Sequence, residues 1–273
     1  MRKKILITGA TDGIGKATAL NLAKEEHSII VHGRNSIKVL NTIEHITNQT
    51  GNTNIIPFVA DFASLNEVKD AAGIITKKVK SLDILINNAA VICPKYEESK
   101  DGYEMTFQVN YLAPFLLTFS LLPLIKKGNS PQIINIASIA HASSLDFNNI
   151  LNPDVYDAYT AYEISKLANI LFTYKLADKL RNEQINVNTL HPGVISTKLL
   201  HVLWSGGASV ESAVSVIKNV IEESEKNDIT GNFFIGKSPV LSSEISYNEN
   251  IQNRMWEYSL ALLKAKGIVP NYF

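Results

Sequence analysis

The stretch Lys4-Ile5-Leu6-Ile7-Thr8-Gly9-Ala10-Thr11-Asp12-Gly13-Ile14-Gly15 decides the fold of this chain. It opens with a short apolar run of the kind that forms a buried strand in a parallel sheet. Glycines follow at once, and the residues from Lys16 to Glu26 favour a helix. A strand, a tight glycine turn and a helix N-terminus make a pyrophosphate site, because backbone N–H groups and the helix dipole both favour a negative charge. Gly9 permits the turn, Gly13 lets the backbone approach the phosphates, and Gly15 lets the helix pack on the strand. The predicted contact residues in this turn are Gly9, Thr11, Asp12, Gly13, Ile14 and Gly15.

Strands and helices alternate along the rest of the chain, which is the pattern of a parallel sheet covered on both faces. The predicted strands are 4–8, 29–32, 55–60, 84–87, 133–137, 187–190 and 233–235. The predicted helices lie near 13–26, 36–49, 64–80, 101–127, 156–183, 208–225 and 247–266. The predicted loops are 91–99, 139–156, 194–207 and 237–246. The 273 residues contain no repeat and no linker. The sequence therefore predicts one α/β domain over 1–273, a doubly wound Rossmann fold with a seven-stranded parallel sheet and a substrate loop around 194–210.

Composition excludes several classes of function. The 26 Lys and Arg residues balance the 26 Asp and Glu residues, which argues against a nucleic-acid partner or an anionic membrane surface. Cys93 is the single cysteine, so no internal disulfide can form and a reducing, cytoplasmic location is expected. The histidines have no metal-ligand spacing, so we expect no metal site. The longest apolar stretch, Leu112 to Ile125, has 14 residues; it predicts a buried helix, and we expect no membrane anchor or signal peptide.

Tyr162-Glu163-Ile164-Ser165-Lys166 suggests acid–base chemistry. On a helix, Tyr162 and Lys166 lie one turn apart on the same face. An ammonium about 4 Å from a phenolate contributes about 4 kcal/mol at an effective dielectric of about 20, which would lower the phenol pKa by about 3 units before desolvation. Tyr162 is therefore a candidate general acid or base. Ser138 follows the apolar run 133–137, so its hydroxyl would lie at the carboxyl end of a strand and could donate to a substrate oxygen.

Together these motifs resemble the short-chain dehydrogenase/reductase family over essentially the whole chain. The residues that carry the resemblance are Thr8-Gly9-x-x-x-Gly13-Ile14-Gly15, Asn87-Asn88-Ala89-Ala90, Asn110, Ser138, Tyr162-x-x-x-Lys166 and Pro192-Gly193. Two further stretches, 165–169 and 190–194, resemble the retinol-dehydrogenase-like branch. Ala90 stands where the family usually has glycine, and we expect its extra methyl group to be tolerated.

The resemblance implies a role for each matching residue. Lys166 would lower the pKa of Tyr162 and bind the nicotinamide ribose, and Asn110 would open its helix locally and hold a water that links Lys166 to solvent. Asp61 would contact the adenine edge, with Phe62 beside the ring. The remaining implied cofactor contacts are Asn88, Ala89 and Ala90 at the adenine ribose, and Pro192, Gly193, Val194 and Thr197 over the nicotinamide. The family often forms homo-oligomers through helices that correspond to 101–127 and 156–183.

The end of the second strand predicts NADP(H) in preference to NAD(H). An NAD site usually has an acidic residue there, which binds the ribose 2′-hydroxyl. This strand instead ends in Gly33-Arg34, and the Arg34 guanidinium can bind a 2′-phosphate by charge-assisted hydrogen bonds.

The predicted function is hydride transfer between nicotinamide and a carbonyl or alcohol carbon. Two alternatives remain open: an enoyl reductase that uses Tyr159, seven residues before Lys166, and a non-catalytic regulator or scaffold that binds the nucleotide. Leu203 and Trp204, in the loop after Pro192-Gly193, predict a lid over a lipophilic small-molecule substrate.

Overall fold

Eight strands form one sheet in the computed structural model, which describes residues 2–269. The strands are β1 (Lys4–Ile7), β2 (Ser28–Gly33), β3 (Ile55–Val59), β4 (Ile84–Asn87), β5 (Gln132–Ile136), β6 (Asn186–His191), β7 (Phe233–Ile235) and β8 (Ser238–Val240). Their order across the sheet is β3-β2-β1-β4-β5-β6-β7-β8, and only the β7–β8 pair is antiparallel. The order reverses between β1 and β4, and such switch points are where open α/β sheets bind ligands.

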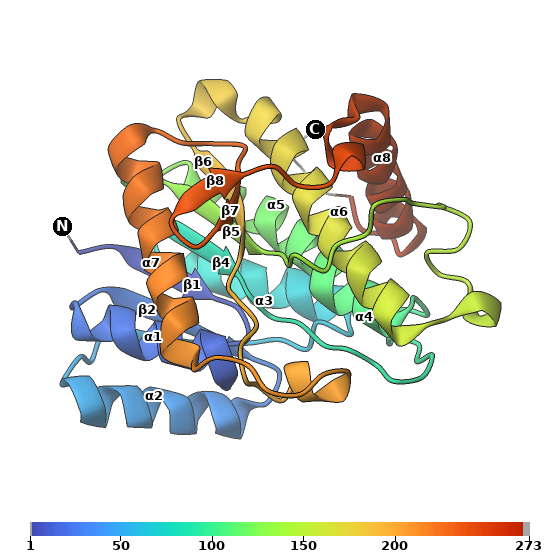
Figure 1. Ribbon diagram of the computed structural model, residues 1–273. Helices are drawn as coiled ribbons and strands as arrows, with labels where there is room; N and C mark the ends of the chain where they lie inside the picture. The colour runs from blue at the N-terminus through green and yellow to red at the C-terminus, as the bar shows by residue number, and fades with distance from the viewer. Residues whose placement is uncertain (1, 270–273) are drawn as a thin grey trace.

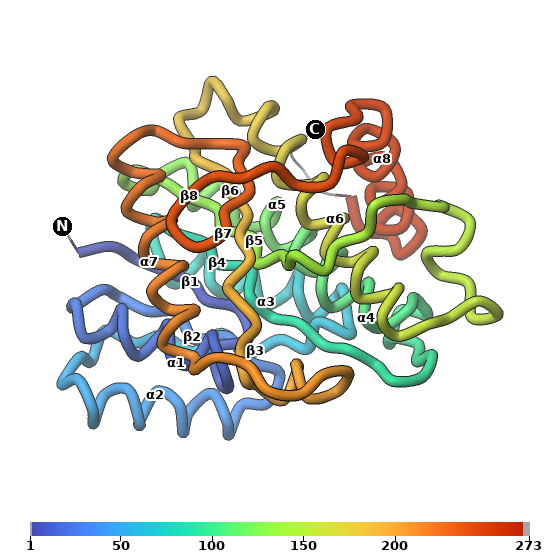
Figure 2. Tube along the Cα trace, viewed as in Figure 1, coloured from blue at the N-terminus to red at the C-terminus, as the bar shows by residue number. Residues whose placement is uncertain are grey.

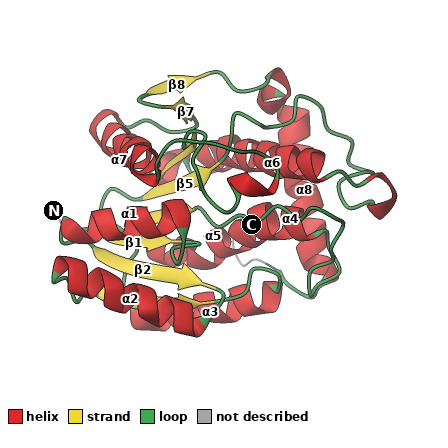
Figure 3. Cartoon of the chain, turned by 60° about the horizontal axis from the view of Figure 1, so that its bottom comes forward, coloured by secondary structure: helices red, strands yellow, loops and turns green. Residues whose placement is uncertain are grey.

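Helices cover both faces of the sheet (Figures 1 and 3). Their bounds are α1 (Gly13–Lys24), α2 (Ser36–Thr50), α3 (Leu65–Lys78), α4 (Met105–Phe107), α5 (Ala113–Ile125), α6 (Ala158–Lys179), α7 (Val210–Asn227) and α8 (Glu249–Ala265). Helices α1, α2 and α7 pack on one face in a core with Ile5, Ile7 and Ile29. Helices α3, α5 and α6 pack on the opposite face with Leu6 and Ile30, and α8 covers the outside of α6. The strand residues that alternate between the two cores are therefore buried on both sides, as the apolar runs in the sequence predict.

The eighth strand corrects the predicted seven-stranded parallel sheet. Residues 238–240 lie in the segment 237–246, which was expected to be a loop. Gly236, with a φ of 62°, and Lys237 make a two-residue turn that folds β8 back on β7. The doubly wound α/β class itself is confirmed. Residues 1 and 270–273 of the predicted domain lie outside the described residues.

The helix predicted over 101–127 begins later and is not uniform. It starts at α4, passes through a π-helical segment at Gln108–Leu112 and continues as α5. The continuous helix Met105–Ile125 has 21 residues, more than the 14-residue apolar stretch seen in the sequence, and meets the length and composition of a membrane span. However, 89% of its most apolar window is buried inside the fold, which is how the core helix of a globular domain meets the same criteria.

Candidate functional site

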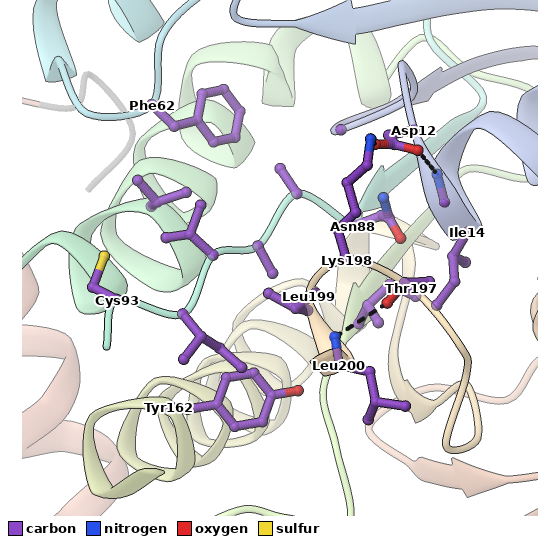
Figure 4. A pocket seen from close by; sticks show the side chains of 18 of the residues that line it. Asp12, Ile14, Phe62, Asn88, Cys93, Tyr162, Thr197, Lys198, Leu199 and Leu200 are labelled. Carbon is purple, nitrogen blue, oxygen red and sulfur yellow. Dashed lines mark hydrogen bonds and ion pairs between the residues drawn. The ribbon is translucent and has the colours of Figure 1, made fainter. Parts of the chain in front are cut away.

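A single cavity of about 1290 Å³ brings nearly all of the predicted site residues together at the carboxyl ends of the strands. The predicted residues that line it are Gly9, Thr11, Asp12, Gly13, Ile14, Arg34, Asp61, Phe62, Asn88, Ala89, Ala90, Ser138, Tyr162, Lys166, Pro192, Gly193, Val194 and Thr197. Gly15 and Asn110 are not among the lining residues. Figure 4 views part of this cavity, with Tyr162 and Asp12 at opposite ends of the group of side chains drawn.

The glycine turn is shaped so that side chains would not fit. Gly9 and Gly13 have φ values of 65° and 51°, which favour glycine. A Cβ on Gly15 would lie 2.4 Å from the Gly9 carbonyl oxygen, so Gly15 allows α1 to pack directly against the turn. Asp12 begins α1 by accepting a hydrogen bond from Gly13 N at 2.9 Å. The turn therefore leaves backbone, not side chain, facing the space where a pyrophosphate would sit.

Thr8 holds the first glycine against the end of β4. Its hydroxyl oxygen accepts hydrogen bonds from Asn88 N at 2.8 Å and Ala89 N at 2.9 Å, while Asn88 Nδ2 donates to Thr8 O at 2.8 Å. The end of β4 is thus joined to the turn after β1 by three hydrogen bonds, which connect two walls of this part of the cavity.

His32 is a site residue that sequence reasoning missed. Its ring is buried, Nδ1 accepts from Gly9 N at 3.0 Å, and Nε2 lies 3.0 Å from the Ala60 carbonyl oxygen, to which the remaining ring N–H donates. The ring stacks on Phe62 with centroids 4.3 Å apart. Burial lowers the pKa of His32 to about 4, so the neutral ring links the glycine turn to the end of β3. The signal was a lone imidazole in the apolar strand 29–32.

Charged side chains surround the end of the cavity formed by β2 and β3. Asp61 accepts from Ala63 N at 3.1 Å and pairs with Lys100 at 3.0 Å. Ser64, not Asp61, caps α3. Arg34 lines the same end and is exposed, and in the described part of the chain it has no hydrogen-bond or ion-pair partner. Lys38 also lines this end, so two cations face the cavity where β2 stops.

Ser138 and Tyr162 meet at the other end of the cavity. Ser138 follows β5 and Tyr162 lies in the first turns of α6, which Asp157 caps by accepting from Thr160 N at 2.8 Å. The Ser138 hydroxyl oxygen accepts from Ala140 N at 3.0 Å, and the Ser138 hydroxyl lies close enough to that of Tyr162 to lower the Tyr162 pKa. Because Ala140 N–H occupies a lone pair of the Ser138 oxygen, the Ser138 hydrogen is left to donate toward Tyr162 and the cavity.

Lys166 lies beside this pair but differs from the sequence-based expectation. It is 2% exposed, its ammonium donates to the Ile136 carbonyl at 2.9 Å, and its Nζ lies 5.4 Å from the centroid of the Tyr162 ring. Burial lowers the pKa of Lys166 to about 8. Burial also raises the pKa of Tyr162, and the opposing effect comes from the Ser138 hydroxyl. The Tyr162 pKa is therefore shifted by burial and by Ser138, and the Lys166 ammonium, which was expected to lower it, donates to a strand carbonyl.

Asn110 occupies the centre of the π-helical segment, which agrees with the local opening that the resemblance implies. Its Oδ1 accepts from Val91 N at 2.7 Å, and its Nδ2 donates to Val91 O at 2.9 Å and Ser165 Oγ at 3.1 Å. Its backbone carbonyl accepts from Asn169 Nδ2 at 3.0 Å. These bonds tie the loop after β4 to α6, so the contribution visible in this structure is positional.

The loop after β6 contacts both the glycine turn and Tyr162. Figure 2 shows it running from β6 toward α1. Lys198 pairs with Asp12 at 2.5 Å, and Thr197 lies against Gly13. Trp204 makes edge contacts with the Tyr159 and Tyr162 rings at centroid distances of 5.6 and 5.9 Å. The segment predicted as a lid therefore contacts the candidate general acid directly.

Comparison with known proteins identifies the family. Residues 3–206 match the family model for short chain dehydrogenases. The chain belongs to the short-chain dehydrogenase family. It is therefore an oxidoreductase that acts on alcohol or carbonyl groups, which sets aside the non-catalytic regulator as an interpretation of the sequence.

Named relatives and solved structures agree with this assignment. Mouse retinol dehydrogenase 13 is 35% identical over 96% of this chain and 84% of its own length. Human polyprenol dehydrogenase is 29% identical over 93% of this chain and 83% of its own length. An uncharacterised protein from Mycobacterium paratuberculosis has the same fold, with a TM-score of 0.78 at 24% identity over 96% of this chain and 93% of its own. NADPH-bound carbonyl reductase from chicken fatty liver has a TM-score of 0.69 at 23% identity over 89% of this chain and its whole length.

Proposed function

We propose that this protein is an NADP(H)-dependent oxidoreductase that transfers a hydride between nicotinamide and the carbonyl or alcohol carbon of a lipophilic small molecule. The observation that carries the proposal is the cluster of Ser138, Tyr162 and Lys166 at one end of a cavity that is also lined by the glycine turn. Ser138 and Tyr162 place two hydroxyl groups where they can bind the same substrate oxygen. Lys166 supplies a buried cation next to them.

The glycine turn fits a dinucleotide. Its backbone faces the cavity at Gly9 and Gly13, where a Cβ would come within 2.9 Å of Ala89 and 3.3 Å of Thr197. We expect the pyrophosphate to bind at this turn and Pro192 to Thr197 to cover the nicotinamide, whose C4 supplies or accepts the hydride. The family relationship supports a nicotinamide cofactor, and a carbonyl reductase of the same fold is bound to NADPH.

The chain's own residues would handle the oxygen and the proton. Ser138 donates its hydroxyl hydrogen to the substrate oxygen and so stabilises negative charge that develops there. Tyr162 gives its proton to that oxygen in the reductive direction and takes it back in the oxidative direction. Lys166 would lower the cost of the phenolate once its ammonium turns from Ile136 O toward the ribose and Tyr162.

The charge at the end of β2 supports NADP(H). Arg34 and Lys38 line the cavity there, and the strand carries no carboxylate to repel a 2′-phosphate. Asp61 at the end of β3 also lines this part of the cavity, and its carboxylate pairs with Lys100 at 3.0 Å.

The apolar wall around Tyr162 supports a lipophilic substrate. Ile92, Leu199 and Leu203 pack around Tyr162, and Trp204 makes an edge contact with its ring. Retinol dehydrogenases and a polyprenol dehydrogenase are among the relatives. Transfer of such a substrate into this wall would be favourable by about 0.8 kcal/mol per buried CH₂ group.

The enoyl-reductase alternative has weaker support. Tyr159 is 41% exposed, and the neighbouring Glu163 raises the pKa of its hydroxyl, whereas Ser138 lowers the pKa of Tyr162. Tyr162, which is 8% exposed and lies beside Ser138, is the better placed proton donor.

The test is reduction of straight-chain aldehydes by NADPH, followed by the loss of NADPH absorbance. We expect turnover by the wild-type protein and at least a hundredfold loss of kcat in Tyr162→Phe, because general acid catalysis typically contributes about 10²–10⁴-fold. NADPH affinity should stay within about twofold, since the ring is kept. Tyr159→Phe is the matched control and should keep most of the activity. The opposite ranking of the two variants, or no turnover of any aldehyde, would contradict the proposed function.

A further inference from the structure

His141 lies three residues after Ser138 and uses both ring nitrogens. Its Nδ1 is 2.7 Å from the Ser138 carbonyl oxygen, and its Nε2 is 2.9 Å from Ser243 N. A carbonyl can only accept, and a backbone N–H can only donate. The two contacts together therefore require the neutral tautomer with hydrogen on Nδ1, which donates to Ser138 and accepts from Ser243.

The turn that presents Ser138 depends on this contact. The Ser138 hydroxyl oxygen is held by Ala140 N, and the Ser138 carbonyl is held by His141. The ring of His141 is fixed in turn by an edge contact with Phe233 of β7, at a centroid distance of 5.5 Å. The hydroxyl oxygen and the carbonyl oxygen of Ser138 are thus both bound within the same four-residue turn.

The partner on the other side of His141 belongs to a segment that also binds α6. We define this bracket segment as residues 242–247. Ser243 Oγ donates to Ala142 O at 3.2 Å, and Ser242 Oγ hydrogen-bonds to Tyr174 of α6 at 2.7 Å. The Tyr247 ring stacks on Tyr174 with centroids 5.3 Å apart. One short segment therefore joins the turn that carries Ser138 to the helix that carries Tyr162.

We propose that His141 is a positioning residue that couples the bracket segment to Ser138 and so sets the relative placement of the Ser138 and Tyr162 hydroxyl groups. The inference rests on the proposed function of Ser138. It adds His141, which is not among the residues that line the cavity, together with the bracket segment, about 100 residues later in the chain. Misplacing a catalytic group by about 1 Å can reduce the rate by about 10²-fold, so a device that fixes two hydroxyl groups has a measurable effect.

His141→Phe keeps an aromatic ring beside Phe233 and removes both hydrogen bonds. With n-octanal and NADPH as the probes, we expect kcat to fall at least tenfold, while the KM for n-octanal and the Kd of NADPH change less than threefold. His141→Asn can keep a donor for the Ser138 carbonyl and should restore part of the lost kcat. Ser143→Ala, an exposed change in the same loop, is the control and should have no effect.

Two variants of Ser243 separate the amide from the hydroxyl group. Ser243 has a φ of −59°, which proline also adopts, so Ser243→Pro removes the N–H that donates to His141 and keeps the local backbone angle. Ser243→Ala removes only the hydroxyl. We expect Ser243→Pro to lower kcat in the same direction as His141→Phe, and the double variant to be no worse than His141→Phe alone. Ser243→Ala, which loses only the 3.2 Å bond to Ala142 O, should lower kcat less than Ser243→Pro does.

Further measurements distinguish a failure of the positioning role proposed for His141 from a failure of the role assigned to Ser138. In ¹⁵N NMR, the wild-type ring of His141 should give the signature of the Nδ1–H tautomer. If the Nε2–H tautomer is found, or if folded His141→Phe keeps wild-type kcat while Ser138→Ala loses it, His141 has no positioning role and the proposed function stands. If Ser138→Ala itself keeps wild-type kcat, the assigned role of Ser138 fails and the inference fails with it.

Discussion

Acid should destabilise this protein through His32, and the size of the effect follows from its buried position. The ring is fully buried, and its pKa is lowered from 6.5 to about 4. The folded state therefore keeps His32 neutral between these two values, whereas the unfolded chain takes up a proton. The stabilisation that comes from keeping this ring neutral is complete above pH 6.5 and is lost as the pH falls toward 4. The total loss of unfolding free energy is about 3 kcal/mol, because each pKa unit corresponds to about 1.36 kcal/mol. At pH 5 the expected loss from this residue is about 2 kcal/mol.

The assay measures the free energy of unfolding in urea for wild type and His32→Gln at pH 7 and pH 5. Tryptophan fluorescence reports the unfolding, at one protein concentration throughout. The variant loses the bond to Gly9 and will be less stable at pH 7. Because it lacks the titrating group, we expect its stability deficit relative to wild type to shrink by about 2 kcal/mol at pH 5. His45→Gln, at an exposed position on α2, should keep the pH dependence of wild type. A deficit for His32→Gln that is the same at both pH values would refute the reasoning.

Three further predictions concern the cavity. Arg34→Ala should raise the Kd of NADPH about 10- to 100-fold, because a hydrogen bond to a charged group contributes about 1.5–3 kcal/mol, and it should leave the Kd of NADH nearly unchanged. Titration with both cofactors measures this difference, and equal effects on the two would contradict the phosphate-binding role of Arg34. For wild type, kcat/KM should rise up to about fourfold per added CH₂ along an aldehyde series, and Trp204→Ala should flatten that slope; an unchanged slope would remove the lid from the substrate site. Gly15→Ala should lower thermal stability and NADPH affinity together, because the added Cβ would lie 2.4 Å from Gly9 O. Gly73→Ala is the control, because a Cβ there would meet nothing within 4 Å. Equal behaviour of the two variants would contradict the close-packing argument.

Residues whose role depends on local geometry could be predicted from the sequence. The glycine turn, the placement of Ser138 after a buried strand, and the shared face of Tyr162 and Lys166 all follow from spacing within one strand–helix unit. The resemblance to a family added Asn110, which spacing alone does not distinguish from an ordinary polar helix residue.

Features that depend on contacts between distant segments could not be predicted in this way. The ammonium of Lys166 binds Ile136 O, 30 residues away in the chain, and the Tyr162 pKa is shifted by burial and by Ser138. His32 and His141 each use two ring nitrogens on partners that the sequence does not place nearby. For β8, a signal did exist in Gly236-Lys237, a two-residue turn between short apolar runs, but three residues with a central proline are too few to identify a strand.

Because of the π-helical segment at Gln108–Leu112, the site depends on the number of residues in this helix. An α-helix advances about 1.5 Å and turns about 100° per residue, and a π-helical turn accommodates one residue more than an α-helical turn does. A chain shortened by one residue here would form a regular helix and could still bury α5. The helix on either side would stay in register, because the wide turn had absorbed the extra residue, but the local opening that holds Asn110 against Val91 would be lost. In comparing sequences across this region, a single-residue gap therefore carries more information than most substitutions, because it separates chains that tie the loop after β4 to α6 from chains that do not.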